Sequence, residues 1–307
     1  MTEKFNKNIK DIKMSAEKSL ALLEKCRVCP RNCNVNRLKN EEGFCKTGFL
    51  PRVYSYQAHF GEEPVISGDK GSGTIFFSMC NMSCVFCQNH QFSQHKAGKE
   101  VSFEELADIM LELQAKGCHN INLVTPSHNV PQIINAIAIA RDKGLDIDIV
   151  YNSNGYDSLE SLKLLDGIVD IYLPDLKYAD DKMAEKYSNV KNYVEVSKQA
   201  VLEMYRQVGD NLIIRHLVMP HNISGTDKVL RFIRDEISKD VCISLMGQYY
   251  PCNNSYKYPE LAEKLSLKEY KKAYEIMFSL GLDNGWVQED LDDVREKFIG
   301  ENIKGRS

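Results

Sequence analysis

Short runs of apolar, β-branched residues alternate with amphipathic stretches along most of the chain. Six such runs predict strands: Ile75–Ser78, Ile121–Val124, Ile147–Tyr151, Ile168–Leu173, Leu212–Val218 and Val241–Met246. The stretches between and after them predict helices: Ser102–Lys116, Gln132–Lys143, Leu159–Leu165, the region Ala184–Gln207, Thr226–Ser238 and Ser266–Leu280. Strands that are apolar almost throughout are typical of a parallel sheet covered on its outer face. With right-handed crossovers, the pattern predicts an α/β fold, a partial (β/α)6 barrel.

The first part of the chain does not follow this alternation. Apolar positions among Lys and Glu predict a helix from Ile9 to Lys25, and the Pro, Asn and Gly content of Cys26–Cys45 predicts a knotted loop. We therefore expect an N-terminal helix and a small cysteine-rich metal-binding module over residues 1–67. The barrel with its C-terminal helix is expected over residues 68–307.

Composition narrows the class of protein. The 307 residues are 43% hydrophobic and 27% charged, which are ordinary values for a soluble globular protein. The polar N-terminus has no signal-peptide pattern, and no apolar run approaches the ~18 residues that span a bilayer. The formal net charge is −4 without a long Lys/Arg block, so we expect no nucleic-acid partner. These features predict a cytoplasmic protein, away from membranes, whose ten cysteines include metal ligands.

Three cysteines follow the first predicted strand at C-x3-C-x2-C spacing: Cys80, Cys84 and Cys87. A structural zinc ion and an ordinary 4Fe–4S cluster each take four protein ligands. A loop that offers three thiolates leaves one metal coordination position for a ligand that is not protein. An open position of this kind indicates a reactive site.

This loop, with the aromatic Phe86 before its last cysteine, resembles the cluster-binding loop of the radical S-adenosylmethionine (SAM) enzymes. The resemblance implies a 4Fe–4S cluster on Cys80, Cys84 and Cys87, with one iron free to chelate the amino and carboxylate groups of SAM. It also implies reductive cleavage of SAM to a 5′-deoxyadenosyl radical that abstracts a substrate hydrogen. The expected reductant is an electron donor of the flavodoxin or ferredoxin type.

Within that superfamily the chain resembles the enzymes that activate glycyl radical enzymes, most closely the PflX-type homologues of pyruvate formate-lyase activating enzyme. The segments that carry this resemblance are Cys87–Asn89, Tyr151–Tyr156, Asp175–Lys177, Ile214–Pro220 and the N-terminal CRVCPRNC with Cys45. The resemblance implies a glycyl radical enzyme as partner. An alternative substrate is a small metabolite or a peptide. An alternative from another class of function is a non-catalytic iron–sulfur or zinc protein that serves as electron carrier or scaffold.

Most of the expected cofactor-binding residues follow the predicted strands, where parallel α/β folds gather their functional groups, whereas Arg215 lies within the strand Leu212–Val218. The full set is Phe86, Ser127, His128, Asn154, Asp175, Lys177 and Arg215. By resemblance, Lys177 and Arg215 contact SAM and Asp175 organises the site around it. This is chemically reasonable, because SAM brings a carboxylate that needs a cation and hydroxyl groups that need acceptors.

The chain departs from the activating-enzyme pattern at three places. The family usually has a Gly-Gly-Glu-like segment after the second strand to receive the SAM amino group, and here Val124–His128 stands there. The amino-group acceptor is therefore open among Thr125, Ser127 and His128. Met79 replaces the glycine expected before the first cluster cysteine, and Asn152 stands where several activating enzymes have aspartate.

A second cysteine set lies near the N-terminus: Cys26, Cys29, Cys33 and Cys45. Four thiolates close a metal site, and both tetrahedral zinc and a second iron–sulfur cluster fit that number. Cys118 and Cys242 are isolated, as expected of buried small apolar residues. Cys252, near the end of the sixth predicted strand, is a candidate hydrogen-atom donor.

Overall fold

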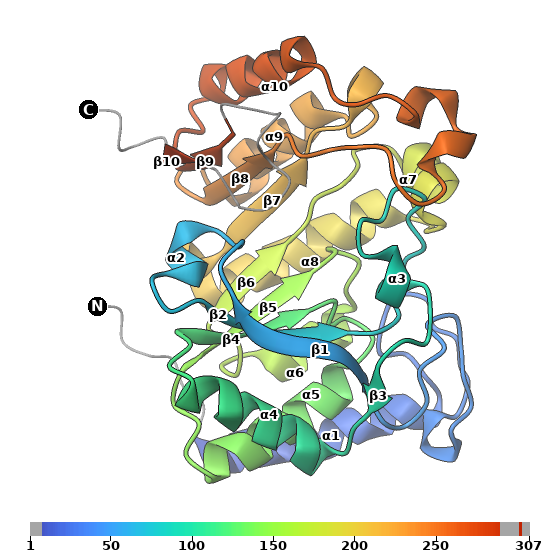
Figure 1. Cartoon of the computed structure of the whole chain (residues 1–307), viewed down its shortest axis with the longest axis vertical. Helices are drawn as coiled ribbons and strands as arrows, with labels where there is room; N and C mark the ends of the chain where they lie inside the picture. The colour runs from blue at the N-terminus through green and yellow to red at the C-terminus, as the bar shows by residue number, and fades with distance from the viewer. Residues whose placement is uncertain (1–7, 289–300, 303–307) are drawn as a thin grey trace.

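The chain forms a curved, mostly parallel sheet surrounded by helices (Figure 1). The computed structural model describes residues 8–288 and 301–302. The parallel strands are β2 (Ser72–Phe77), β4 (Asn120–Val124), β5 (Asp148–Ser153), β6 (Ile171–Pro174), β7 (Ile213–Leu217), β8 (Cys242–Met246) and β9 (Gly285–Val287). Isolated bridges Tyr172↔Leu212 and Asp175↔Arg215 connect β6 with β7. The predicted partial barrel is confirmed, and β9 extends it beyond the sixth expected strand.

Helices alternate with these strands as the polar and apolar pattern predicts. Their bounds are α4 (Phe103–Ala115), α5 (Val130–Asp142), α6 (Leu159–Leu165), α7 (Asp181–Ser188), α8 (Tyr193–Val208), α9 (Thr226–Phe232, followed by a π-helical turn Ile233–Ile237) and α10 (Leu267–Ser279). The capping box of Ser102 and Glu105 is present at the start of α4. The predicted helical region Ala184–Gln207 is two helices, because Asn189 and Asn192 both adopt left-handed backbone conformations.

The predicted N-terminal helix is confirmed as α1 (Ile9–Glu24), which packs against α5. The sequence pattern missed β1 (Arg52–His59), which pairs antiparallel with β2 and with the short β3 (Lys99–Glu100). Most β1 residues are partly exposed, so the strand lacks the continuous apolar run that marks the others. Although β1 precedes the expected boundary at residue 67, it belongs to the same sheet as β2. The division into module and barrel stays a prediction.

A short helix, α2 (Pro64–Ser67), fills one end of the barrel. Its Ile66 is fully buried and packs with Val150, Leu173, Ile213 and Trp286, which point into the interior from β5, β6, β7 and β9. This apolar cluster fills the barrel interior beneath the polar groups that follow the strands. The remaining short elements are α3 (His90–Ser93), which follows the cysteine loop, and β10 (Glu301–Asn302), which pairs with β9. Among the described residues, no helix is long and apolar enough to cross a membrane.

Candidate active site

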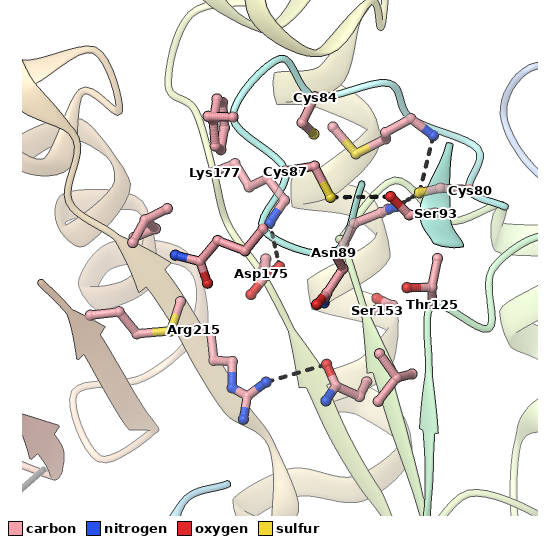
Figure 2. A pocket seen from close by; sticks show the side chains of 18 of the residues that line it. Cys80, Cys84, Cys87, Asn89, Ser93, Thr125, Ser153, Asp175, Lys177 and Arg215 are labelled. Carbon is pink, nitrogen blue, oxygen red and sulfur yellow. Dashed lines mark hydrogen bonds and ion pairs between the residues drawn. The ribbon is translucent and has the colours of Figure 1, made fainter. Parts of the chain in front are cut away.

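A cavity of about 410 Å³ lies at the carboxyl ends of the parallel strands (Figure 2). Its walls come from the cysteine loop, from β1 and the segment after it, and from the ends of β4 to β8. Its lining includes Glu62, Cys80, Cys84, Phe86, Cys87, Thr125, Asn152, Ser153, Asn154, Asp175, Lys177 and Arg215. Most of the predicted cofactor residues therefore meet in one place.

The three cysteines of the loop lie together on the cavity wall (Figure 2). Burial raises the pKa of Cys80 to about 12 and that of Cys84 to about 11, and the neighbouring thiolates add to each shift. Polar hydrogens already point at sulfur: the Met82 N–H lies 3.3 Å from Cys80 Sγ and the Ser188 hydroxyl 3.0 Å from Cys84 Sγ. Three partly buried thiols that oppose one another's ionisation need a shared cation to become thiolates. The irons of a cluster supply that charge, so this loop fits a 4Fe–4S cluster.

The backbone conformation of Met79 explains why the activating-enzyme pattern has a glycine before the first cysteine. Its φ is +68°, a left-handed conformation that glycine adopts without strain and other residues rarely do. The Met79 N–H donates to the Phe92 carbonyl at 2.8 Å, which fixes the turn. At Met79 the loop therefore has a backbone conformation that glycine would adopt without strain, although the residue differs.

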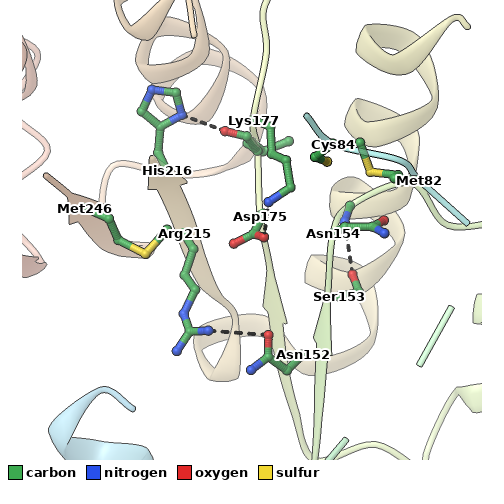
Figure 3. A network of polar contacts seen from close by, with 12 residues as sticks. Met82, Cys84, Asn152, Ser153, Asn154, Asp175, Lys177, Arg215, His216 and Met246 are labelled. Carbon is green, nitrogen blue, oxygen red and sulfur yellow. Dashed lines mark hydrogen bonds and ion pairs between the residues drawn. The ribbon is translucent and has the colours of Figure 1, made fainter. Parts of the chain in front are cut away.

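Asp175 and Lys177 follow β6 and form an ion pair beside the cysteines (Figure 3). Burial disfavours the charged lysine, yet the Asp175 carboxylate and the Cys84 and Cys87 thiolates together raise the pKa of Lys177 above its usual value. An ammonium group is thus held in the charged form at a largely buried position on the cavity wall. Neither residue therefore belongs to an exposed polar turn after the strand.

Arg215 projects from β7 toward the cavity floor, and its partners were not identified from the sequence. Glu63 accepts from its Nε at 2.7 Å and from its Nη2 at 2.5 Å, and Glu62 accepts from the same Nη2. Asn152 lies 3.4 Å from Nη1 (Figure 3). Burial disfavours the ionised form of Glu63, which is fully buried. The Arg215 guanidinium outweighs this effect and lowers the pKa of the Glu63 carboxyl. The Arg215 guanidinium, which was expected to contact SAM, therefore donates hydrogen bonds to two carboxylates of the segment between β1 and α2.

The three candidates for binding the SAM amino group follow β4 and differ in whether they face the cavity. Thr125 lines the cavity with a φ of +62°, a strained conformation for a β-branched residue. Ser127 and His128 are buried and are not among the residues that line this cavity. His128 Nε2 lies 3.0 Å from the Ser78 carbonyl, and burial lowers the pKa of this histidine to about 3. Of the three, Thr125 alone is placed to meet a ligand in the cavity.

Asn154 and Phe86 brace the cysteine loop as well as lining the cavity. The Asn154 amide donates to Asn81 Oδ1 at 2.7 Å and to Cys80 Sγ at 3.3 Å, which connects the end of β5 to the loop. The Phe86 ring packs against Tyr178 and Tyr249, with centroids 6.5 and 6.0 Å away. Cys252 does not line the cavity, because its thiol donates to the Phe86 carbonyl at 3.2 Å.

The N-terminal cysteines gather around a second, much smaller cavity of about 10 Å³. Its lining includes Cys26, Cys29, Cys33, Cys45, Arg31, Arg37, Asn81 and His128. Within residues 8–288 and 301–302, no group of three or more His, Cys, Asp or Glu side chains already converges to the spacing of a bound metal ion. Both metal-ligand sets therefore stay predictions.

A curved parallel sheet with three thiols and a charged lysine at its carboxyl ends defines the class of protein. A sequence profile of the Radical SAM superfamily matches residues 74–233, and the chain belongs to this superfamily. It is 34% identical over 287 residues to the uncharacterized protein MJ0674 of Methanocaldococcus jannaschii, covering 90% of this chain and 80% of that protein. It is 23% identical over 172 residues to the pyruvate formate-lyase-activating enzyme of Clostridium pasteurianum, covering 52% of this chain and 70% of that one.

A solved structure supports the fold. The FeFe-hydrogenase maturase HydG from Carboxydothermus hydrogenoformans superposes with a TM-score of 0.50 at 14% identity, covering 70% of this chain and 53% of that chain. This chain thus spans about half the length of that neighbour. The protein is a radical SAM enzyme, and membership implies a 4Fe–4S cluster and SAM that is cleaved to a radical.

Proposed function

We propose that this enzyme activates a partner glycyl radical enzyme by removing hydrogen from the Cα of a glycine. The observation that carries the proposal is the loop from Met79 to Asn89, which ends in the activating-enzyme triplet Cys-Gln-Asn and keeps the backbone that the family glycine would give. The Asp175–Lys177 triplet beside it has the same resemblance. The local similarity to a pyruvate formate-lyase-activating enzyme supports the same reading.

The chain's own residues have distinct parts in this proposal. A bound cluster supplies the electron that cleaves SAM, and the electron reaches it from a donor of the flavodoxin or ferredoxin type. Lys177 pairs with the SAM carboxylate, while Asp175 keeps the lysine charged and offers acceptors to hydroxyl groups. Thr125 is the acceptor for the amino group. Phe86 and the other buried aromatic side chains exclude water from the cavity.

One observation favours a second substrate class. Glu62 and Glu63 are both buried and, among the described residues, each forms its ion pair with Arg215. Two carboxylates on one guanidinium leave a surplus negative charge at the cavity floor. Because an uncompensated buried charge is costly, this floor favours a ligand with a cationic group. A small metabolite or peptide that carries an amine fits that requirement.

The deciding experiment uses anaerobically reconstituted, reduced enzyme with SAM and candidate glycyl radical enzymes from the same genome. We expect 5′-deoxyadenosine and the doublet of a glycyl radical in the electron paramagnetic resonance (EPR) spectrum. If 5′-deoxyadenosine accumulates only with amine-containing metabolites or peptides, the second class replaces the first. If SAM is never cleaved, a non-catalytic electron carrier or scaffold explains the cysteines better than either.

Three further parts of the proposal come from the sequence. The N-terminal cysteines hold zinc or a second iron–sulfur cluster, and residues 1–67 form a separate module around it. The enzyme works in the cytoplasm, where thiol ligands stay reduced. Metal analysis and localisation of a tagged chain test these parts.

A further inference from the structure

The N-terminal cysteine set lies in a short, largely buried segment and shares its cavity with two arginines. Cys26, Cys29 and Cys45 are each 6% exposed, and the Phe44 N–H points at Cys33 Sγ from 3.4 Å. A Cβ added to Gly43 would lie 2.8 Å from the Cys33 sulfur, so the glycine lets the backbone close over the thiols. All four cysteines of the 20-residue segment Cys26–Cys45 therefore line one small cavity.

The size of the enclosed space separates the two metal groups that four thiolates can hold. The cavity measures about 10 Å³, which is about the room that one water-sized atom needs. A single zinc ion fits this space. A 4Fe–4S core adds eight atoms between the thiolates and requires the shell to be far wider.

Two arginines mark the site as one for an anionic centre. Arg37 is 1% exposed, and its Nε and Nη1 donate to the carbonyls of Gly48 and His128 at 2.9 and 2.7 Å. Its Nη2 is buried and has no hydrogen-bond partner among the described residues. Since neither Arg31 nor Arg37 pairs with a carboxylate in this part of the structure, the buried guanidinium of Arg37 needs another anion. Zinc with four thiolates carries two net negative charges, which the two arginines balance.

Arg31 also contacts the cluster loop. Its Nε donates to the Asn81 carbonyl at 2.8 Å, and its guanidinium lies 3.4 Å above the centre of the Phe44 ring. Asn81 directly follows Cys80, is fully buried and receives the Asn154 amide described above. One side chain therefore joins the four-cysteine shell to the loop that carries the cluster.

We propose that Cys26, Cys29, Cys33 and Cys45 bind a single zinc ion whose charge is balanced by Arg31 and Arg37, and that Arg31 is a positioning residue that ties this site to the cluster loop through Asn81. The zinc assignment stands on the N-terminal residues alone. The link to the cluster rests on the proposed radical SAM site.

Metal analysis of one variant tests the zinc assignment. The triple variant Cys80→Ala/Cys84→Ala/Cys87→Ala removes the cluster ligands and leaves the N-terminal set intact. We expect one zinc ion per chain and no iron by plasma mass spectrometry. Adding Cys29→Ala should abolish zinc binding, whereas adding Cys118→Ala, another buried but isolated cysteine, should not. Iron with sulfide in the triple variant overturns the assignment, and so does the absence of both metals.

If the Cys29→Ala addition does not fold, a thiol reagent replaces it. Modification of the triple variant in the presence of a chromogenic zinc chelator should release the ion in step with loss of four thiols. Release unrelated to thiol modification overturns the assignment. Circular dichroism of each variant records whether it is folded.

The midpoint reduction potential of the cluster, rather than enzyme activity, tests the role of Arg31. A positive charge beside Cys80 stabilises the reduced, more negative cluster, so Arg31→Ala should shift its midpoint potential to a more negative value. Arg31→Lys should shift the potential less than Arg31→Ala does, because lysine keeps the positive charge but lacks the planar guanidinium that donates several hydrogen bonds. The matched control Arg27→Ala lies on the same loop, exposed and paired with Glu160, and should leave the potential unchanged. An unchanged potential in Arg31→Ala overturns the link. A wild-type protein that forms no SAM-responsive cluster overturns the link and the proposed function while the zinc result stands.

Discussion

The two cysteine sets of this protein differ in how completely the chain surrounds them. Cys80, Cys84 and Cys87 open onto a cavity of about 410 Å³ that also presents Asp175, Lys177 and Arg215. The N-terminal four line a cavity of about 10 Å³ together with arginine, histidine, asparagine and apolar side chains. Three ligands with a charged cavity beside them suit reaction with a bound molecule. Four ligands in a closed shell suit a metal that is held and not offered to a substrate.

The comparison also shows that the two sites are neighbours. Asn81 lines the small cavity, while Cys80, next to it in sequence, lines the large one. A change at one site is therefore able to reach the other through a single peptide unit. The following variants test how far the two are separable, beginning with the largest expected effect.

Removal of one open-site ligand should eliminate the chemistry. We expect Cys84→Ala to reduce anaerobic 5′-deoxyadenosine formation to background, because a cluster with two protein thiolates is not retained. The matched control is Cys252→Ala. Its thiol contacts the Phe86 carbonyl outside the cavity, so this variant should cleave SAM like the wild type. Loss of cleavage in the control would instead support Cys252 as a hydrogen-atom donor or ligand.

Breaking the buried ion pair at the cavity floor should cost the most stability. Glu63→Gln weakens the charge-assisted hydrogen bonds of Arg215, which keeps Glu62, and we expect a loss of about 1.5–3 kcal/mol, the contribution of a hydrogen bond to a charged group. The folded-state pKa of Glu63 is lowered below its ordinary 4.5, so its contribution is present above about pH 4.5 and disappears as the pH falls through the folded pKa. Urea unfolding at several pH values measures both effects. The exposed pair of Arg52 and Glu100 is the control, and Glu100→Gln should change stability by less than about 1 kcal/mol.

Removing the buried ammonium should weaken SAM binding with a smaller effect on the closed site. A hydrogen bond to a charged group contributes about 1.5–3 kcal/mol, so Lys177→Met should raise the KM for SAM by roughly 10- to 150-fold. Lys186→Met, which removes an exposed lysine paired with Glu260, is the matched control and should leave the KM unchanged. An unchanged KM in Lys177→Met means that the SAM carboxylate binds elsewhere. Metal content at the N-terminal cysteines should be unaffected in both.

The smallest effect is expected away from both sites. Ser102→Ala removes the hydroxyl that accepts the Glu105 N–H at 3.0 Å and should lower the free energy of unfolding by about 1 kcal/mol. SAM cleavage and both metals should be retained. A variant that lost either metal would show that stability alone controls metal content, which would blur the distinction between the sites.

Much of the fold followed from residue patterns that are local in sequence. The continuous apolar runs marked the parallel strands, and Ser102 with Glu105 marked the start of α4, because burial on both faces and helix capping leave signals within a few residues. The half-exposed β1 has no such signal and was missed. The two helices α7 and α8 were merged because left-handed Asn residues resemble ordinary polar helix positions.

The candidate site was predicted less evenly. The spacing of Cys80, Cys84 and Cys87 identified the open loop, because metal geometry requires ligands close together in the chain. The partners of Arg215 could be inferred only in kind: a buried guanidinium needs an anion, but the sequence does not say which one. Glu63 is 152 positions away from Arg215.

The sequence alone determined the class of chemistry, through three thiols at fixed spacing and a run of strands whose ends converge. Only the tertiary structure decided which groups meet at those ends. The left-handed backbone of Thr125 leaves this residue on the cavity wall, while His128, three positions later, lines the N-terminal cavity. The difference arises because periodicity sets which face a residue takes within a strand. Beyond the strand end, side-chain direction depends on individual backbone angles and on charges brought together from distant segments.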